Sequence, residues 1–328
     1  MTSLLSRSAE NLFWLARYIE RTESLARILD VQETFARDSG WRQDWRLVLV
    51  INADSEAFFK RHAEADSATV LQFYVNERAN PTSIFSAVHA ARENARALRP
   101  LISTEMWTQL NMLYNRVLAL KPADVAEGKL STLCDWVKRG CDAHTGITAG
   151  TFYRDEGWCF YQLGSAIECA DQTTRLLDVK FLNFMAHQDQ DPGSATDSFY
   201  WMALLRSAAG YQAFRRRHQR GMVPEQVATF LLSDPCFPRS VASCLGLIDE
   251  QLTGLRRQYN LKAAAHALQF LDEIRDDLDV RRVQKAIDNG ELHRFNDFLQ
   301  RSFSELTTRI ATGFFGHAPV TAEVAARA

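Results

Sequence analysis

Two segments of this sequence, far apart in the chain, share one charged pattern. YIERTESLARILDV occupies residues 18–31, and AIECADQTTRLLDV occupies residues 166–179. Both contain Ile-Glu and, seven residues after the Glu, an Arg-x-Leu-Asp-Val sequence. The residue after the Glu differs, because Arg21 stands in the first segment and Cys169 in the second. A repeated segment of this kind constrains the fold strongly, because one architecture must accommodate both copies.

The repeat continues beyond these segments in three blocks that keep the same order. An offset of 148 matches Leu15, Ile19, Glu20, Arg27, Leu29, Asp30 and Val31 with Leu163, Ile167, Glu168, Arg175, Leu177, Asp178 and Val179. An offset of 156 matches Trp45, Leu49, Ala53, Ala57, Phe58, Arg61 and His62 with Trp201, Leu205, Ala209, Ala213, Phe214, Arg217 and His218. An offset of 157 matches Phe73, Pro81, Ser83, Leu98 and Arg99 with Phe230, Pro238, Ser240, Leu255 and Arg256. Three collinear blocks indicate a tandem duplication of about 150 residues.

The spacing of apolar residues is helical almost throughout, and no stretch alternates convincingly with period two. The chain has 15 Gly and 8 Pro in 328 residues, which favours long helices over turn-rich β structure. The sequence therefore predicts an all-α fold, a helical bundle built from two tandem pseudo-symmetric repeats. The predicted helices span residues 8–37, 41–62, 82–99, 101–120, 123–144, 151–187, 197–219, 238–257, 261–279 and 285–312.

The duplication also predicts how the chain divides. The first helical repeat covers residues 1–150, and the second covers residues 151–315. We expect the two repeats to pack face to face about a pseudo-twofold axis as one compact unit. Residues 316–328 form a small, Ala-rich tail that we expect to be disordered.

Composition excludes several classes of function. The net charge of −2 gives no bulk argument for binding nucleic acid or an anionic membrane, and no apolar run of about 18 residues predicts a membrane span. The first residues lack the pattern of a signal peptide, so we expect a cytoplasmic protein whose six cysteines are buried free thiols. Metal-ligand spacings, phosphate-binding loops and nucleophile elbows are absent from the sequence, so we expect no metal and no cofactor. The sequence leaves the oligomeric state open.

The charged repeat itself is the first candidate site. On a helical wheel, ordered charges flank an apolar stripe in residues 8–37. We predict a partly buried acid–base array in which Glu20 lies between Arg17 and Arg21 and stays ionised. The alternative is an ion-pair ladder that fixes helix register. Arg17 and Arg21 align with Ser165 and Cys169, so only one copy keeps these arginines, and this asymmetry favours a site.

The second candidate is the segment LLSDPCFPRSVASC, residues 231–244. Pro238 suits the first turn of a helix, and Arg239 and Ser240 would present donors beside the helix N-terminus, where anions bind. The alternative is a turn that only starts the helix. The aligned segment of the first repeat has Thr82 in place of the arginine.

The sequence resembles the alpha-E domain family, bacterial all-helical proteins named for a Glu-Arg (ER) motif. LSRSAENLFWLARYIERTESLARILDV and FPRSVASCL carry this resemblance, which extends to about residue 312. The resemblance implies an association with circularly permuted ATP-grasp ligases, and also with transglutaminase-like proteins, and thus a role in forming or modifying peptide or amide bonds. The ER motif falls on Glu20 and Arg21, and its counterpart in the second half is Glu168 with Cys169 next to it.

We therefore expect an accessory partner of an ATP-grasp amide ligase that binds an anionic amino-acid or peptidyl group in a charged interior cleft. Two alternatives are a stand-alone enzyme with Glu20 as general base and a docking scaffold without chemistry. The sequence leaves open whether the chain is an enzyme. The candidate catalytic residues are Glu20, Arg21 and Glu168, and the candidate substrate-binding residues are Arg17, Arg27, Arg175, Arg239 and Ser240.

Overall fold

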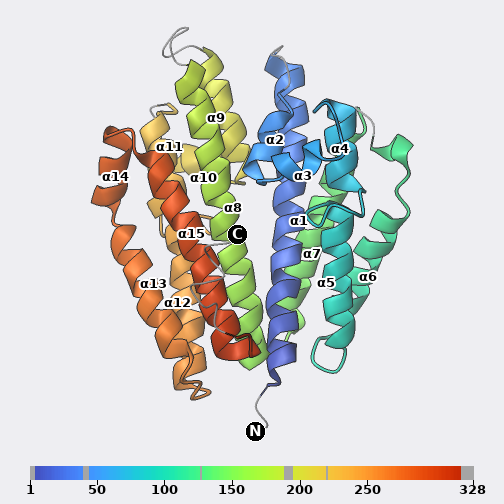
Figure 1. Ribbon diagram of the computed structural model, residues 1–328, viewed down its shortest axis with the longest axis vertical. Coiled ribbons are helices and arrows are strands. Elements are labelled where there is room, and N and C mark those ends of the chain that lie inside the picture. Colours follow the sequence, from blue (N-terminus) through green and yellow to red (C-terminus); the bar gives the residue numbers. More distant parts are fainter. Residues whose placement is uncertain (1–3, 40–43, 126–127, 188–194, 219–220, 319–328) are drawn as a thin grey trace.

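The two copies of the charged repeat form parts of two long helices at the centre of the molecule. In the computed structural model, α1 spans Ser6–Ser39 and α8 spans Glu156–His187, and the two helices pack against each other (Figure 1). The structure describes residues 4–39, 44–125, 128–187, 195–218 and 221–318. The predicted tail falls largely on residues 319–328, which lie outside these ranges.

Every regular element in the described residues is helical, which confirms the predicted fold class. The helices after α1 are α2 (Arg46–Ile51), α3 (Ser55–Phe59), α4 (Ser67–Val75), α5 (Ile84–Ala97), α6 (Thr104–Leu118), the 3₁₀ turn η1 (Pro122–Asp124) and α7 (Leu130–Thr151). Those after α8 are α9 (Ala195–Ser207), α10 (Tyr211–Arg217), α11 (Pro224–Ser233), α12 (Val241–Arg257), α13 (Ala264–Asp277), α14 (Val280–Asp288), α15 (Leu292–Ile310) and the π-helical turn η3 (Ala311–Phe315). None of these helices has the length and apolar character needed to cross a bilayer.

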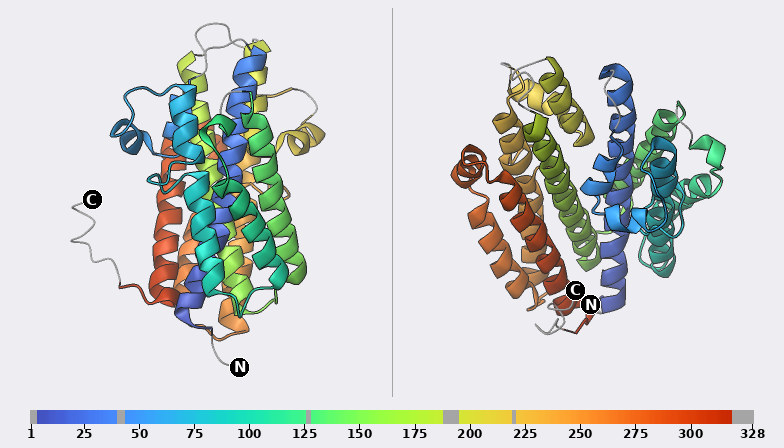
Figure 2. Two further views of the ribbon diagram at one scale, coloured as in Figure 1. Left: turned by 90° about the vertical axis from the view of Figure 1, so that its right-hand side faces the viewer. Right: turned by 45° about the horizontal axis from the view of Figure 1, so that its top comes forward.

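The two halves of the chain lie on either side of the α1–α8 pair (Figure 1). α5 and α7 pack on α1, whereas α12 and α15 pack on α8. The axes of the long helices are roughly aligned with one another, as two further views show (Figure 2). Besides the α1–α8 packing, α2 packs on α8, and both α9 and η3 pack on α1. The two halves of the chain are thus in contact at several places.

Aligned positions of the two halves have matching local structure. Ala53 and Ala209 both have a positive φ, 57° and 56°. His62 stacks on Phe58 at 4.7 Å between ring centroids, and the aligned His218 stacks on Phe214 at 4.5 Å. These pairs follow the offset of 156 residues that the sequence indicates. They support the duplication and the division near residue 150, both of which stay predictions.

Several predicted helix boundaries are wrong, and the backbone explains why. Residues 41–62 and 197–219 were each expected to form one helix, but the left-handed residues Ala53 and Ala209 split them into α2 and α3, and into α9 and α10. Gly290, with φ 70°, similarly separates α14 from α15. The short helices α4 and α11 occupy stretches where no helix was expected. For α4, the Asp66 side chain accepts a hydrogen bond from the backbone of Thr69, a cap that the sequence analysis missed.

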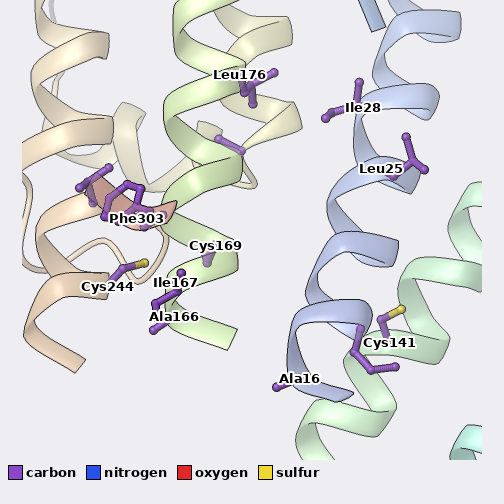
Figure 3. Close-up of a cluster of buried hydrophobic side chains, with 14 of the residues drawn as sticks. Ala16, Leu25, Ile28, Cys141, Ala166, Ile167, Cys169, Leu176, Cys244 and Phe303 are labelled. Atoms are coloured by element: carbon purple, nitrogen blue, oxygen red, sulfur yellow. The ribbon is translucent and has the colours of Figure 1, made fainter. Parts of the chain in front are cut away.

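Apolar side chains fill the space beside the central helix pair. Ile28 of α1 and Leu176 of α8 are buried and point into the space between these two helices (Figure 3). Cys169 of α8 and Cys244 of α12 are buried as well (Figure 3). Five cysteines are buried free thiols as predicted, but Cys236 is exposed because it lies in the turn before α12.

The buried His144 predicts how stability depends on pH. Its ring lies on α7 beside Tyr161 and is 1% exposed, and burial lowers the pKa of His144 from 6.5 to about 4. The unfolded chain therefore binds a proton at this histidine more readily than the folded protein does. The contribution of neutral His144 to the free energy of unfolding is fully present above pH 6.5 and is lost as the pH falls toward 4. The free energy of unfolding in urea should be measured at pH 7.5 and at pH 4.5. Between these pH values, we expect it to fall by about 2 to 3 kcal/mol less in a His144→Leu variant than in the wild type. Equal losses would contradict this assignment.

Candidate functional site

Charged side chains of α1 and α8 lie near the interface of these helices in three groups of ion pairs and hydrogen bonds, centred on Glu168, on Arg239 and on Arg175. We call the three groups together the central network. It contains seven of the eight residues that the sequence analysis selected, together with nearby polar side chains. Its members are Arg17, Glu20, Arg21, Glu23, Ser24, Arg27, Glu168, Asp171, Gln172, Arg175 and Arg239.

Glu168 of α8 is the most enclosed member of the central network, with 0% exposure. Arg17 Nε and Arg21 Nε each donate to one of its carboxylate oxygens at 2.7 Å, and Arg21 Nη2 donates at 3.0 Å. Burial alone would raise the pKa of Glu168, but the charges and hydrogen bonds of Arg21 and Arg17 lower it to about 2. Glu168 is therefore a permanently ionised anchor for both arginines.

Arg17 is closed off from solvent on its remaining sides. Its guanidinium lies 4.9 Å from the Trp14 ring and 5.6 Å from the Phe13 ring, and Nη1 donates to Thr307 Oγ1 of α15 at 3.1 Å. Its side chain is only 10% exposed. A ligand could reach Arg17 only by displacing one of these partners.

The predicted arrangement around Glu20 is wrong. Arg17 and Arg21 lie one turn apart on the side of α1 that faces α8, so both bind Glu168 rather than Glu20. Glu20 lies on a neighbouring face of α1 and pairs with Nη2 of Arg239, which also donates to Ser24 Oγ at 3.0 Å. Burial raises the pKa of Glu20, and the charge of Arg239 opposes that rise.

The difference between the two copies now has a physical explanation. Glu20 and Glu168 occupy equivalent positions, and each is neutralised by guanidinium from the other half of the chain. Glu168 is neutralised by two arginines of α1, whereas Glu20 is neutralised by Arg239, which precedes α12. The first half has Thr82 in place of Arg239, and the second half has no arginines in place of Arg17 and Arg21. Each half therefore supplies arginine to the other half's glutamate either from its long central helix or from a residue just before a later helix, but not from both. Neutralising a buried carboxylate is therefore one reason to keep Arg17 and Arg21.

One further pairing recurs at equivalent positions. Arg27 binds Glu23 at 2.7 Å, and Arg175 binds Asp171 at 2.8 Å. Both are i,i+4 pairs within one helix. The contacts of Arg27 and Arg175 follow directly from the repeated sequence, whereas those of Arg17, Arg21 and Arg239 depend on helix packing.

Part of the central network is open to solvent. The side chains of Arg21 and Arg175 are 22% and 29% exposed. Asp54, in the turn between α2 and α3, lies close enough for both arginines to act on its carboxylate. Burial raises the pKa of Asp54, whereas a hydrogen bond from Thr82 Oγ1, at 2.6 Å, and the two arginines oppose that rise. We call Arg21, Arg175, Asp54 and Thr82 the open edge of the central network.

A family model covers residues 4–315 of the chain. Its family is Alpha-E, described as a predicted alpha-helical domain with a conserved ER motif. The chain belongs to the Alpha-E family. No curated protein and no solved structure matches the sequence.

Glu20 and Arg21, where the sequence analysis places the ER motif, have different partners in this structure. Glu20 turns toward Arg239, whereas Arg21 turns toward Glu168 in the other half of the chain. Adjacent residues on a helix point about 100° apart, which lets one dipeptide contact two neighbouring elements. In this Alpha-E chain, Glu20 and Arg21 thus link α1 to the start of α12 and to α8.

Two differences from the predicted site are notable. Ser240, expected to bind substrate, is fully buried, and its Oγ accepts from Ser243 N and donates to Asp234 O. It caps α12, so we leave it out of the proposed site. Asp54 was not predicted, because its position depends on the left-handed Ala53 before it, and an alanine gives no sequence signal for that conformation.

Proposed function

We propose that this protein is an accessory partner of an ATP-grasp amide ligase system and binds an anionic amino-acid or peptidyl group. The open edge of the central network is the site we propose. The observation that supports it best is that the side chains of Arg21 and Arg175 are 22% and 29% exposed, close to the fully buried Glu168.

Arg175 is the donor best placed to bind a carboxylate. Among the described residues, its only hydrogen bond runs from Nε to Asp171, so the two terminal nitrogens keep donors for a ligand. Arg21 uses Nε and Nη2 on Glu168 and keeps Nη1. Two guanidinium groups held by carboxylates in this way are preorganised to bind a further carboxylate.

Asp54 supplies the opposite charge within electrostatic range of both arginines. A bound amino acid carries an amine next to its carboxylate, and Asp54 with Thr82 Oγ1 would accept hydrogen bonds from that amine. The site is thus suited to a zwitterion or a peptide terminus. In an amide ligase system, the chain would hold one of the two joined groups for the ligase, and a transglutaminase-like protein would be a further partner.

Two other functions have some support. The raised pKa of Glu20 is in the direction that a general base requires, which favours a stand-alone enzyme. Arg239 already occupies the Glu20 carboxylate, however, and would have to move before a proton could be taken. The enclosed contacts of Glu168 favour a scaffold whose charges only fix helix register.

A binding experiment tests the proposed site. Calorimetry with free amino acids and dipeptides as probes should show binding to the wild type. In an Arg175→Gln variant, the affinity should fall by about tenfold or more, because one charge-assisted hydrogen bond is worth that factor. Arg139→Gln is the matched control, because Arg139 makes the same i,i+4 contact to Asp135 at 2.8 Å on the exposed side of α7. Equal binding by both variants, or no binding to the wild type, would contradict the site.

A further inference from the structure

The outer side of the α5–α6 pair carries a continuous stack of guanidinium groups and rings. Arg78 lies over Phe85 at 4.7 Å, Phe85 stacks on His89 at 6.0 Å with 8° between ring planes, and His89 contacts Tyr114 at 5.8 Å. We call it the α5–α6 ladder, and its members are Arg78, Phe85, His89, Tyr114, Arg92, Trp107 and Arg99.

Arginine continues the stack to its other end. Arg92 lies 4.7 Å from the Tyr114 ring and 5.5 Å from the Trp107 ring, and Arg99 lies 4.8 Å from Trp107. Arg78 and Arg99 are exposed, whereas the three aromatic rings are half-buried. α5 has 14 residues, about 20 Å at 1.5 Å per residue, and the two terminal arginines lie beyond its opposite ends.

The packing of α5 against α6 does not require this ladder. The offset of 157 aligns Phe85, His89 and Arg92 with Ala242, Gly246 and Asp249 of α12. There, α12 and α13 are joined by an ion pair between Asp249 and Arg275 at 3.5 Å. In the second half, the aligned helix α12 therefore packs on α13 without such a ladder. Hydrogen bonds to Asn111 and Glu93 give Arg92 a structural role, whereas the side chains of Arg78 and Arg99 make no such bonds within the described residues.

The terminal arginines present unused donors. Arg92 donates to Asn111 and Glu93, but within the described residues no carboxylate lies within ion-pair distance of Arg78 or Arg99. Stacking on a ring holds a guanidinium by its face and leaves the N–H groups on its edge free. Because the stack already restricts these side chains, binding costs less conformational entropy than it would for a free surface arginine.

We propose that the outer face of α5 and α6 is a docking surface for an acidic, extended segment of a protein partner. Carboxylates of that segment bind Arg78 at one end and Arg99 at the other. Leu118, 44% exposed and one turn after Tyr114, offers an apolar contact on the same side of α6. This surface is separate from the central network and does not depend on the proposed site there.

The arrangement favours a protein over a single-stranded nucleic acid. Proteins that bind single strands leave aromatic faces free for bases to stack on. In the ladder, Phe85, Tyr114 and Trp107 each already contact two neighbours.

Fluorescence anisotropy on the full chain can test this surface. The probe is a labelled twelve-residue peptide with Glu at alternating positions and Leu between them, measured at low salt. We expect the Arg78→Gln, Arg99→Gln double variant to lose about tenfold in affinity, since two partly exposed ion pairs together are worth that factor. The control is an Arg139→Gln, Arg301→Gln double variant, which removes the same charge from exposed i,i+4 pairs elsewhere and should bind as the wild type does.

The same measurements identify the outcomes that overturn the proposal. Equal affinity of the two double variants, or no peptide binding by the wild type, would show that the ladder is not a docking surface for acidic segments. A labelled twelve-nucleotide DNA strand that binds more tightly than the peptide, and that depends on Arg78 and Arg99, would assign the surface to nucleic acid instead. Both double variants should unfold at the wild-type urea concentration, because neither removes a buried contact.

Discussion

Of all the substitutions proposed here, Gly164→Ala should lower the free energy of unfolding most. A Cβ added at Gly164 of α8 would lie 2.1 Å from the carbonyl oxygen of Phe13 and 2.9 Å from its carbonyl carbon. Both are backbone atoms of α1, so a side-chain rotation cannot relieve the clash, and the two central helices must separate. We expect a loss of more than about 3 kcal/mol in the free energy of unfolding, above the usual range for overpacking.

Urea unfolding followed by circular dichroism measures this effect, and the chain provides its own control. Gly246 lies in α12 with no atom within 4 Å of an added Cβ. Gly246→Ala should therefore stabilise the protein by about 0.5 to 1 kcal/mol, the helical advantage of Ala over Gly. If Gly164→Ala behaved like Gly246→Ala, α1 and α8 could not cross as closely as the structure shows.

Removing the Glu168 carboxylate should have the second largest effect. In a Glu168→Ala variant, Arg17 and Arg21 lose their shared counter-ion while their side chains remain only 10% and 22% exposed. Breaking a buried ion pair from one side typically costs about 3 to 5 kcal/mol, because an uncompensated charge stays behind. We expect a loss in this range in urea unfolding at pH 7.

An exposed pair serves as the control for Glu168. Glu56 binds Lys60 at 2.6 Å, and both side chains are largely exposed. Glu56→Ala should change the free energy of unfolding by less than about 1 kcal/mol. A loss below about 1 kcal/mol in Glu168→Ala would mean that solvent reaches Arg17 and Arg21 freely, which would contradict the enclosed geometry of the central network.

The sequence was a good guide to helix content and a poor guide to where helices break. Helical periodicity predicted the all-α architecture correctly, because burial of one apolar face follows directly from spacing. The breaks at Ala53 and Ala209 were missed, because alanine favours helix and its left-handed conformation here depends on tertiary contacts. Gly164 was missed as well, since only the structure shows how closely Phe13 approaches it.

For the candidate site, the structure places seven of the eight selected residues in the central network, but several of them have partners that the sequence analysis did not expect. A helical wheel places side chains on the faces of one helix, but it does not say which element covers each face. Arg17 and Arg21 flank Glu20 in sequence, yet they bind Glu168, and Glu20 binds Arg239, 219 residues away. Such pairings depend on the packing of α1, α8 and α12, which no local pattern encodes.

The central claim is that the open edge holds one of the groups joined by a partner ligase. The most direct test is mass analysis of the products formed by the co-purified ATP-grasp ligase with the wild-type chain, with Arg175→Gln, with Arg139→Gln and without the chain. We predict that a product formed with the wild type and Arg139→Gln is absent without the chain and strongly reduced with Arg175→Gln. Identical products in all four reactions would contradict the claim.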